Sequence, residues 1–230
     1  QSNQVMDKIA FCIPTTSNKR EWKNFEDTYL NNILLPSIKD LDITIYVGYG
    51  TEDNFFMDTE NRKLEYNNIK LVWKAFHKHQ GNPCAIWNGL AGVAFDDGFD
   101  YVFVLGDDIK LSDNPNWIKT FIDKLKDNDN IGYSAGWSNN DQIPTQFLLH
   151  KTHFDIFGWI YPPQIKNWQC DDFLYHLYGK YGNWLKDIHH LNLGGEPRYV
   201  PDNCVKLREL LVKRHRKQLF QYLNKNKYMD

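Results

Sequence analysis

Short apolar runs alternate with longer amphipathic stretches through the first half of the chain. Residues 8–13, 41–47 and 69–76 are largely apolar runs of strand length, and polar residues follow each of them. Residues 101–105 are apolar at successive positions, as in a strand that is buried on both faces of a parallel sheet. The pattern therefore predicts four strands, each followed by a polar loop.

Two of the intervening stretches have the period of a helix. The first starts at about residue 21, and Pro36 stops or kinks it because proline lacks the amide hydrogen that a helix uses. The second starts at Asn82-Pro83, since Asn is a favoured N-cap and Pro at the first helical position forfeits no hydrogen bond. The apolar positions of the first helix are Trp22, Phe25, Tyr29, Ile33 and Leu34.

Alternating strands and helices predict an α/β fold with a mostly parallel sheet flanked by helices. In such sheets, ligands bind beyond the carboxyl ends of the strands. Three of the predicted strands end in polar loops, at residues 14–18, 48–53 and 106–108. We therefore expect these three loops to meet in one crevice.

The pattern changes after about Ile131. Loops rich in Gly, Asn and Pro are predicted here, with a helix beginning in the acidic stretch 168–172 and a short strand at 185–188. From Val205 onward the chain is helical and basic, which we interpret as one solvated helix face, with binding to acidic lipid or a partner as the alternative. Four tryptophans punctuate the irregular region: Trp137, Trp159, Trp168 and Trp184.

Size and charge narrow the class of protein. The 230 residues suit one α/β domain, and the net charge of −2 gives no overall field that attracts nucleic acid or a membrane. No run of about 18 apolar residues occurs, so no transmembrane segment is predicted. Because the chain starts at Gln1, a processed form or a domain of a larger protein is compatible with it.

The cysteines form no CxxC pair, and no Asn-x-Ser/Thr acceptor occurs. We therefore expect free, mostly buried thiols in a reducing, cytoplasmic environment. The four are Cys12, Cys84, Cys170 and Cys204.

Two carboxylates, Asp107 and Asp108, directly follow the most apolar predicted strand. A turn with a helix N-cap is the plain explanation. However, the segment 101–111, with Gly106-Asp107-Asp108 at its centre, resembles the metal-binding strand end of the GT-A glycosyltransferases. The resemblance covers roughly residues 8–200, as an order of elements and local motifs.

The resemblance implies that Asp108 binds a divalent metal, Mn²⁺ or Mg²⁺, which also grips the diphosphate of a nucleotide-sugar donor. Such cations take carboxylate and phosphate oxygens and neutralise the charge on the leaving diphosphate. Gly106 stands where the family carries the first acid of its Asp-x-Asp motif. Asp107 is then expected to hold the ribose or the water shell of the metal.

A late histidine is a further metal ligand in the family. The resemblance implies His190 for this role, with His189 in reserve, and an ordinary core or surface histidine is the alternative. Arg198 is expected to pair with the diphosphate, or else to form a surface ion pair. Gly194-Gly195 permits close approach of the backbone to phosphates.

Residues 168–172 resemble the acidic motif that GT-A enzymes place at a helix start beside the acceptor. The resemblance implies that Asp172 is the base that takes the acceptor's proton and that Asp171 binds acceptor hydroxyls. In a retaining enzyme Asp172 would only orient the acceptor, and two acids that favour the helix dipole are the plain alternative. Trp137 and Trp168 are candidate platforms for sugars, because a ring face is a flat apolar surface.

A further set of residues is expected to contact the nucleoside, because these residues lie at the ends of predicted strands. They are Pro14, Thr15, Thr16, Ser17, Glu52 and Asp53. For Glu52 and Asp53, an ordinary loop is the alternative. We predict a single domain over 1–230, with a nucleotide-sugar-binding half at 8–111, an acceptor and metal half at 131–204, and a basic C-terminal helix at 205–230.

The predicted function is that of a metal-dependent glycosyltransferase of the hexosyltransferase class. It moves a sugar from a UDP-sugar to a hydroxyl of a glycan, protein or small-molecule acceptor, without a nucleic-acid partner. The alternatives are a non-catalytic relic that binds sugar or nucleotide, and a sugar-phosphate nucleotidyltransferase, whose phosphate loop is Gly-rich and basic, unlike residues 14–17. A glycoside hydrolase built on a barrel would need a longer chain.

Overall fold

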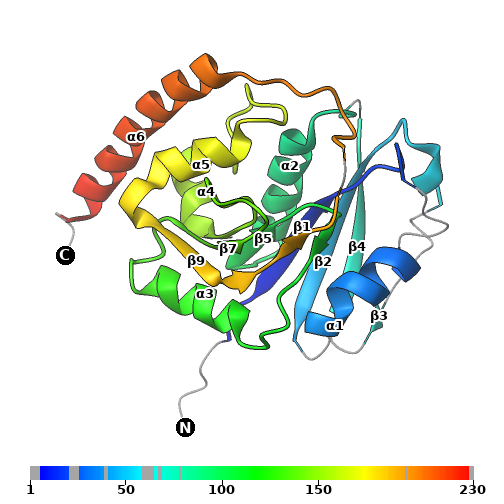
Figure 1. Cartoon of the computed structure of the whole chain (residues 1–230). Helices are drawn as coiled ribbons and strands as arrows, with labels where there is room; N and C mark the ends of the chain where they lie inside the picture. The colour runs from blue at the N-terminus through cyan, green and yellow to red at the C-terminus, as the bar shows by residue number, and fades with distance from the viewer. Residues whose placement is uncertain are drawn as a thin grey trace, which may run out of the picture.

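The computed structural model of the chain describes residues 6–20, 26–38, 41–58, 65–66, 69–77, 79–194 and 196–227. An eight-stranded sheet crosses the molecule in the order β3-β4-β2-β1-β5-β8-β7-β9 (Figure 1). Four neighbouring strands at its centre are parallel and confirm the four predicted strands. They are β4 (Ile69–Phe76), β2 (Ile43–Gly50), β1 (Ile9–Pro14) and β5 (Tyr101–Val104).

The outer strands complete a mostly parallel sheet. On one side, β3 (Glu65–Tyr66) pairs antiparallel with β4. On the other, β8 (Phe147–His150) is antiparallel to both β5 and β7 (Tyr133–Trp137), and β9 (Gly182–His189) is parallel to β7. The α/β architecture predicted from the pattern is therefore confirmed.

Each face of the sheet has its own core, because successive side chains of a strand point to opposite faces. In β1, Phe11 and Ile13 point to one face and pack with the first helices and α3. Ala10 and Cys12 point to the other, which α2, α4, α5 and α6 cover. The helices of the first face are η1 (Glu26–Leu34), α1 (Leu35–Ile38) and α3 (Trp117–Lys126). Those of the second are α2 (Pro83–Asp96), α4 (Lys151–Phe157), α5 (Cys170–Tyr178) and α6 (Val205–Lys227).

The structure has helix boundaries close to the residues predicted for them, Pro36 and Asn82-Pro83. Asn82 caps α2, since its side chain accepts a hydrogen bond from the amide of Ala85 at 3.1 Å, and Pro83 is the first helical residue. Pro36 lies within α1, and this helix ends two residues later. Trp22 and Phe25 lie outside the described residues. Two single-turn helices, η2 (Asn54–Phe56) and η4 (Gly179–Tyr181), complete the elements.

The second half is more regular than its sequence pattern suggests. Residues 131–157 form β7, β8 and α4, and Trp137 and Trp184 lie on strands. In β7 the buried residues include Ser134 and Gly136, which give no apolar strand pattern. The hydroxyl of Ser134 is satisfied by donating to the carbonyl of Phe121 at 2.8 Å. Tertiary contacts therefore set these strands, and local pattern alone does not reveal them.

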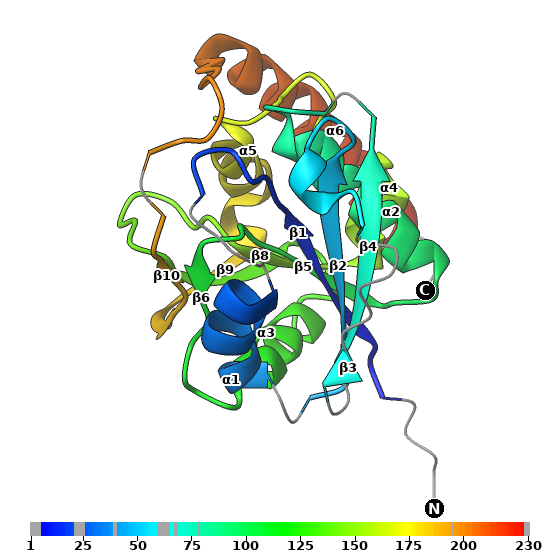
Figure 2. The same cartoon turned by 90° about the vertical axis from the view of Figure 1, so that its right-hand side faces the viewer.

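A short antiparallel ribbon joins distant parts of the chain. It consists of β6 (Ile109–Lys110) and β10 (Leu191–Asn192), and it lies to one side of the main sheet (Figure 2). The ribbon brings the residues after β9 beside the loop that follows β5. Among the described helices, none combines the length and apolar character needed to cross a membrane. The four cysteines are free thiols, as predicted.

Candidate functional site

A cavity of about 550 Å³ opens at the carboxyl ends of β1, β2 and β5. Its lining combines all three polar loops that the sequence pattern placed at strand ends, so the predicted crevice is confirmed. It also includes Arg198 and Asp171 from the second half of the chain. The residues from the strand ends are Pro14, Thr15, Thr16, Ser17, Glu52, Asp53, Asp107 and Asp108.

Asp107 anchors two guanidinium groups at the base of this cavity. Its side chain is only 4% exposed, and both Arg20 and Arg198 donate to its Oδ1, the latter at 2.8 Å. Thr15 donates to the other carboxylate oxygen at 3.0 Å. Burial raises the pKa of Asp107 above its ordinary value, although the two guanidinium groups oppose the shift. Asp107 therefore holds cationic side chains at the cavity floor.

Asp108 lies in a slot between two glycines. A Cβ on Gly106 would come within 2.6 Å of Asp108 Oδ1, and one on Gly194 within 1.9 Å of its Oδ2. The backbone of Asp108 accepts a hydrogen bond from the Leu193 amide at 2.8 Å, which fixes this approach. A side chain at position 106 would therefore require only that the Asp108 carboxylate rotate away. Gly195 lies outside the described residues.

Asp53 shapes the loop that follows β1. Its carboxylate accepts hydrogen bonds from the amide and hydroxyl of Ser17, both at 2.7 Å, and from the Phe55 amide at 3.2 Å. The hydroxyl of Thr16 donates to it at 3.4 Å. Asp53 thus joins the loops after β1 and β2, whereas Glu52 is exposed at the cavity edge. The carboxylate of Asp53 is occupied by protein donors.

A smaller cavity of about 230 Å³ adjoins the first. It lies at the N-terminus of α5, where Asp171 and Asp172 occupy the first turn, as predicted. Trp168 lines it, with a 43% exposed side chain. Four residues line both cavities: Pro83, Trp87, Asp171 and Tyr199.

Asp171 therefore lies at the junction of the cavities, whereas Asp172 lines only the smaller one. Burial raises the pKa of Asp171 well above its ordinary value, and the neighbouring Asp172 carboxylate adds to the rise. A carboxyl group with this environment holds a proton readily. The two adjacent acids therefore differ in position, because only Asp171 lines both cavities.

His190 is not brought to either cavity. It is fully buried, its Nδ1 accepts a hydrogen bond from the Ser112 amide at 3.0 Å, and its ring contacts Phe103, Trp117 and Phe121. Burial lowers its pKa to about 3, so it is a neutral core histidine. Of the two predictions for His190, an ordinary core histidine agrees with this position and a metal ligand at the cavity does not.

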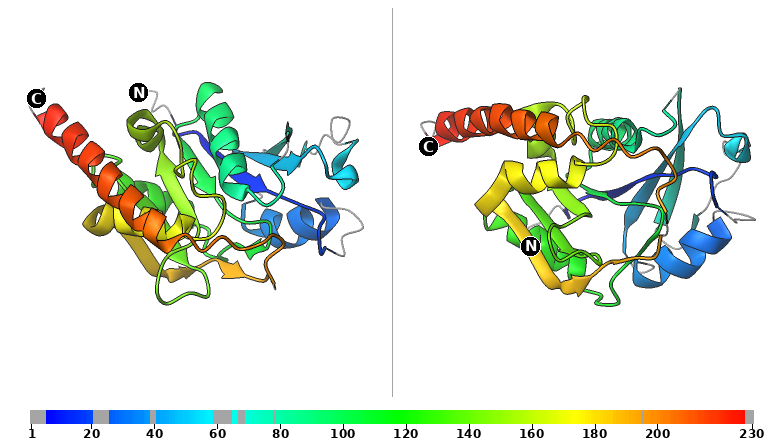
Figure 3. Two further views of the ribbon diagram at one scale, coloured as in Figure 1. Left: turned by 90° about the horizontal axis from the view of Figure 1, so that it is seen from above. Right: turned by 45° about the horizontal axis from the view of Figure 1, so that its top comes forward.

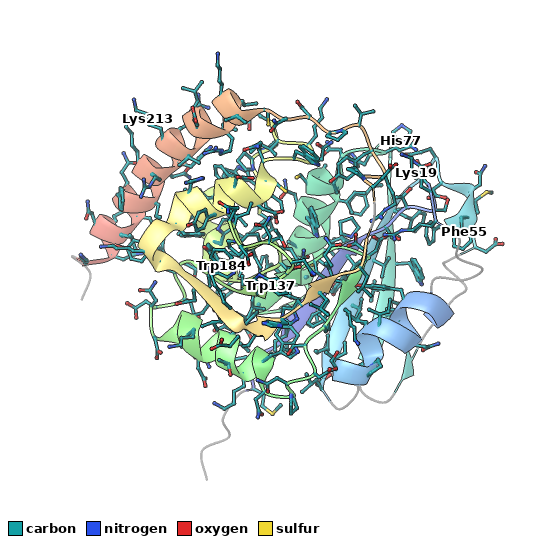
Figure 4. All side chains as sticks on the ribbon, viewed as in Figure 1. Lys19, Phe55, His77, Trp137, Trp184 and Lys213 are labelled. Carbon is teal, nitrogen blue, oxygen red and sulfur yellow. The ribbon has the colours of Figure 1, made fainter. Side chains whose placement is uncertain are left out.

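His189 and Trp137 also lie away from both cavities. Their rings contact each other with centroids 4.9 Å apart, and Trp137 Nε1 donates to Asp141 Oδ1 at 2.7 Å. Figure 4 shows Trp137 well apart from Phe55, a residue of the larger cavity's lining. In the part of the chain that the structure describes, no three His, Cys, Asp or Glu side chains are grouped to hold a metal ion.

Oxygen ligands for a hard cation are nevertheless present at the cavity edge. Asp108 Oδ2 and Asn192 Oδ1 both lie close to Gly194; Arg198 Nη2 is 3.4 Å from this Asp108 oxygen, and the Gly194 amide donates to Asn192 Oδ1 at 2.8 Å. Both Asp108 and Asn192 line the larger cavity. One carboxylate, one amide oxygen and the phosphates of a ligand are a donor set that Mg²⁺ or Mn²⁺ accepts. Asp108 and Asn192 therefore offer oxygen ligands of the type that a divalent cation accepts, in competition with the Arg198 guanidinium for Asp108.

Two of the site residues, Arg20 and Asn192, were missed in the sequence analysis. Arg20 follows the polar loop after the first predicted strand, and this position was its only local signal. Asn192 reaches the site through the pairing of β10 with β6, a contact over about eighty residues that no local pattern reveals.

Comparisons with known proteins bear on the fold. No protein-family model matches the chain, and no curated protein matches its sequence. Among solved structures, TarS of S. aureus in complex with UDP-GlcNAc is similar at a TM-score of 0.52 and 14% identity, over 84% of this chain and 62% of that one. The mannosyltransferase PcManGT from Pyrobaculum calidifontis, in complex with GDP-Man and Mn²⁺, is similar at a TM-score of 0.59 and 10% identity, over 85% and 59%.

A cytidylyltransferase from Leptospira borgpetersenii is also similar, at a TM-score of 0.51 and 10% identity, over 78% of this chain and 75% of that one. At these identities the similarity shows the fold, which is that of nucleotide-diphospho-sugar transferases and confirms the GT-A resemblance. The chain spans only 37% of a longer TarS structure. Because a cytidylyltransferase shares the fold, the fold alone does not distinguish glycosyl transfer from nucleotidyl transfer.

Proposed function

We propose that this protein is a glycosyltransferase that holds a nucleotide-sugar donor in the larger cavity and an acceptor in the smaller one. The observation that carries the proposal is the position of Asp171, which lines both cavities. Transfer requires one protein group that reaches the acceptor hydroxyl while this hydroxyl faces the anomeric carbon of the donor. A carboxyl group at the junction of two adjoining cavities meets this requirement.

The donor's diphosphate is expected to bind to Arg20 and Arg198. Both guanidinium groups are held in place by Asp107, so little conformational freedom is lost when they meet a phosphate. Hydrogen bonds between guanidinium groups and phosphate are charge-assisted and can be bidentate. The loop Pro14–Ser17, locked by Asp53, then faces the nucleoside, as the strand-end position predicted.

We assign a UDP-sugar as the donor. This assignment is supported by the similar structure of TarS, which is in complex with UDP-GlcNAc. PcManGT is in complex with GDP-Man, so a GDP-sugar is the alternative donor to test. Asp108 and Asn192 would hold a divalent cation, Mn²⁺ or Mg²⁺, together with the donor's phosphates. A cation bound there neutralises negative charge on the leaving diphosphate.

Asp171 is assigned as the general base and Asp172 as a residue that orients the acceptor, the reverse of the roles that the motif implied. The acceptor hydroxyl oxygen attacks the anomeric carbon, its proton passes to Asp171, and the bond from that carbon to the nucleoside diphosphate breaks. The raised pKa of Asp171 gives the carboxylate a high affinity for this proton. Trp168 supplies a flat apolar face at the smaller cavity, where a sugar ring can stack.

The decisive experiment pairs Asp171→Asn with Asp172→Asn. Asn keeps the size of the side chain but cannot take a proton, so turnover of Asp171→Asn should fall about 10²- to 10⁴-fold while its Kd for UDP stays unchanged. Asp172→Asn should mainly raise the KM for the acceptor. Full turnover of Asp171→Asn together with an inactive Asp172→Asn would restore the roles that the motif implied.

Donor class and cation are tested by calorimetry with UDP, GDP and CDP, each with Mn²⁺ and with EDTA. We expect UDP to bind tightest and to require Mn²⁺, and we expect Asp108→Asn to abolish the effect of Mn²⁺. Equal binding in EDTA would show that Arg20 and Arg198 hold the diphosphate without a cation. Failure of all three nucleotides to bind would favour the non-catalytic relic.

Nucleotidyl transfer is the second candidate, and one observation favours it. Arg20 lies just beyond the loop after β1 and reaches Asp107, so the phosphate region does contain a basic residue from this segment. This reaction would consume a nucleoside triphosphate and a sugar phosphate and release pyrophosphate. Pyrophosphate release from UTP or CTP with hexose 1-phosphate would support it, and release of UDP from a UDP-sugar would exclude it.

A further inference from the structure

The helix α6 carries a charge opposite to that of the rest of the molecule. It contains eight Lys and Arg residues and one acid, Glu209, which gives a net charge of +7. The whole chain has a net charge of −2, so the remainder carries −9. Figure 3 shows α6 along the outside of the molecule in both views. This separation of charge would turn α6 toward an anionic surface and the remainder away from it.

The outer face of α6 is apolar as well as basic. Its inner side is fixed by Leu211, Val212 and Leu219, which are buried against the second core. Facing away from them, Leu210 is 67% exposed and Phe220 is 45% exposed. A helix packed in this way normally presents only polar residues to water.

The exposed apolar and basic residues share one face because they recur at intervals of three and four. Leu207 and Leu210 precede Lys213, and Lys217 and Phe220 follow it. Lys213 points away from the body of the molecule in Figure 4. The outer face of α6 therefore carries Lys213 and Lys217 with exposed apolar side chains on either side of them along the helix.

We propose that the outer face of α6 docks on the surface of an anionic lipid bilayer. Basic side chains are attracted to anionic headgroups, and Leu and Phe beside them can enter the boundary between headgroups and acyl chains. A helix of 23 residues is about 34 Å long and can lie flat along that surface. Nucleic acid would match the cations equally well, but it gives no burial for Leu210 and Phe220.

This docking would also orient the smaller cavity. The first turn of α6 is tied to the cavity's rim, because Arg208 donates to the Gln169 side chain at 3.2 Å and Gln169 donates to Asn203 at 2.7 Å. Trp168, the neighbour of Gln169, lines that cavity. The proposal concerns the surface of α6 and stands independently of the reaction catalysed at Asp171.

The test is sedimentation of the whole chain with vesicles of neutral phosphatidylcholine and with vesicles containing phosphatidylserine. The protein should bind only the anionic vesicles. Lys213→Glu/Lys217→Glu should lower the partition coefficient about 30-fold or more, at the typical contribution of each basic residue. Leu210→Ser/Phe220→Ser should lower it as well, although this variant keeps every charge.

Two controls on distant surfaces carry matched changes. Lys119→Glu/Lys124→Glu, on the exposed side of α3, reverses the same number of charges, and Met57→Ser removes an apolar side chain that is 70% exposed. Both should bind vesicles as the unmodified chain does. No binding to either kind of vesicle, or equal binding to both, would overturn docking on an anionic bilayer. Unchanged binding of Leu210→Ser/Phe220→Ser with competition by duplex DNA would overturn it in favour of a purely charged surface.

Discussion

The two cavities meet at Asp171, but the molecule builds them in different ways. Much of the larger cavity is made by loops that directly follow β1, β2 and β5, and residues such as Asp171, Asn192 and Arg198 from the second half of the chain complete its lining. The smaller cavity is made by the starts of α2 and α5 and by the segment before α6, none of which are neighbours in sequence. Strand ends therefore position much of the proposed donor side, whereas contacts between distant segments position the proposed acceptor side.

One buried amide shows how the acceptor side is held. Asn167 accepts hydrogen bonds from the amides of Trp168 at 2.6 Å and Asp202 at 2.9 Å, and it donates to the carbonyls of Gly81 at 3.0 Å and Val200 at 3.2 Å. Its side chain thus joins three segments at one point. On the donor side Asp53 joins only the loops after β1 and β2, which come from neighbouring parallel strands of the sheet.

Asn167→Ala is the change that should separate the two sides most strongly. It leaves buried backbone groups without partners, at about 1–3 kcal/mol each, so we expect a loss of at least about 3 kcal/mol in the free energy of unfolding. Urea unfolding measures this loss. Binding of UDP with Mn²⁺, measured below the unfolding transition, should change less, because among the described residues Gly81 is the one hydrogen-bond partner of the Asn167 side chain in the lining of the larger cavity. Equal loss of both properties would show that the two sides fold as one unit.

Arg198→Ala should have the next largest effect, this time on the donor side. Charge-assisted hydrogen bonds contribute about 1.5–3 kcal/mol, so the Kd for UDP should rise about 10- to 150-fold. The variant also leaves the buried carboxylate of Asp107 with less compensation, which lowers stability. Adding Asp107→Asn should recover stability without recovering the affinity for UDP. Recovery of affinity would mean that Arg198 only balances Asp107.

The same contrast explains what the sequence could reveal. The strands at 8–13 and 101–105, and the convergence of their polar ends, follow from hydrophobic runs and the rules of parallel sheets. Arg20 and Asn192 could not be found in this way, because a guanidinium contact across the site and a two-residue ribbon have no local pattern. The assignment of His190 to a metal relied on family position alone, and its position among aromatic rings is set by the core.

The pH dependence of stability tests the junction itself. Because the pKa of Asp171 is raised in the folded state, this state keeps a proton that the unfolded chain loses above about pH 4, so stability falls as the pH rises. Asp171→Asn removes this effect and should raise Tm at pH 7, by about 2–4 °C per kcal/mol for a chain of this size. The gain should vanish below about pH 4. In the unmodified enzyme the transfer rate should rise with pH as Asp171 loses its proton, and a gain in Tm that is the same at all pH values would contradict the assignment.

The smallest expected effect compares the two tryptophans that the sequence proposed as sugar platforms. Trp168 lines the smaller cavity and is 43% exposed, whereas Trp137 lies outside both cavities with its ring against His189. Stacking on an aromatic ring contributes about 0.5–1.5 kcal/mol, so Trp168→Ala should raise the KM for the acceptor about 2- to 12-fold with an unchanged Kd for UDP. Trp137→Ala should alter neither constant. A higher acceptor KM in Trp137→Ala alone would move the acceptor to the edge of β7 and separate it from Asp171, so this modest pair of measurements also tests the placement of the reaction between the cavities.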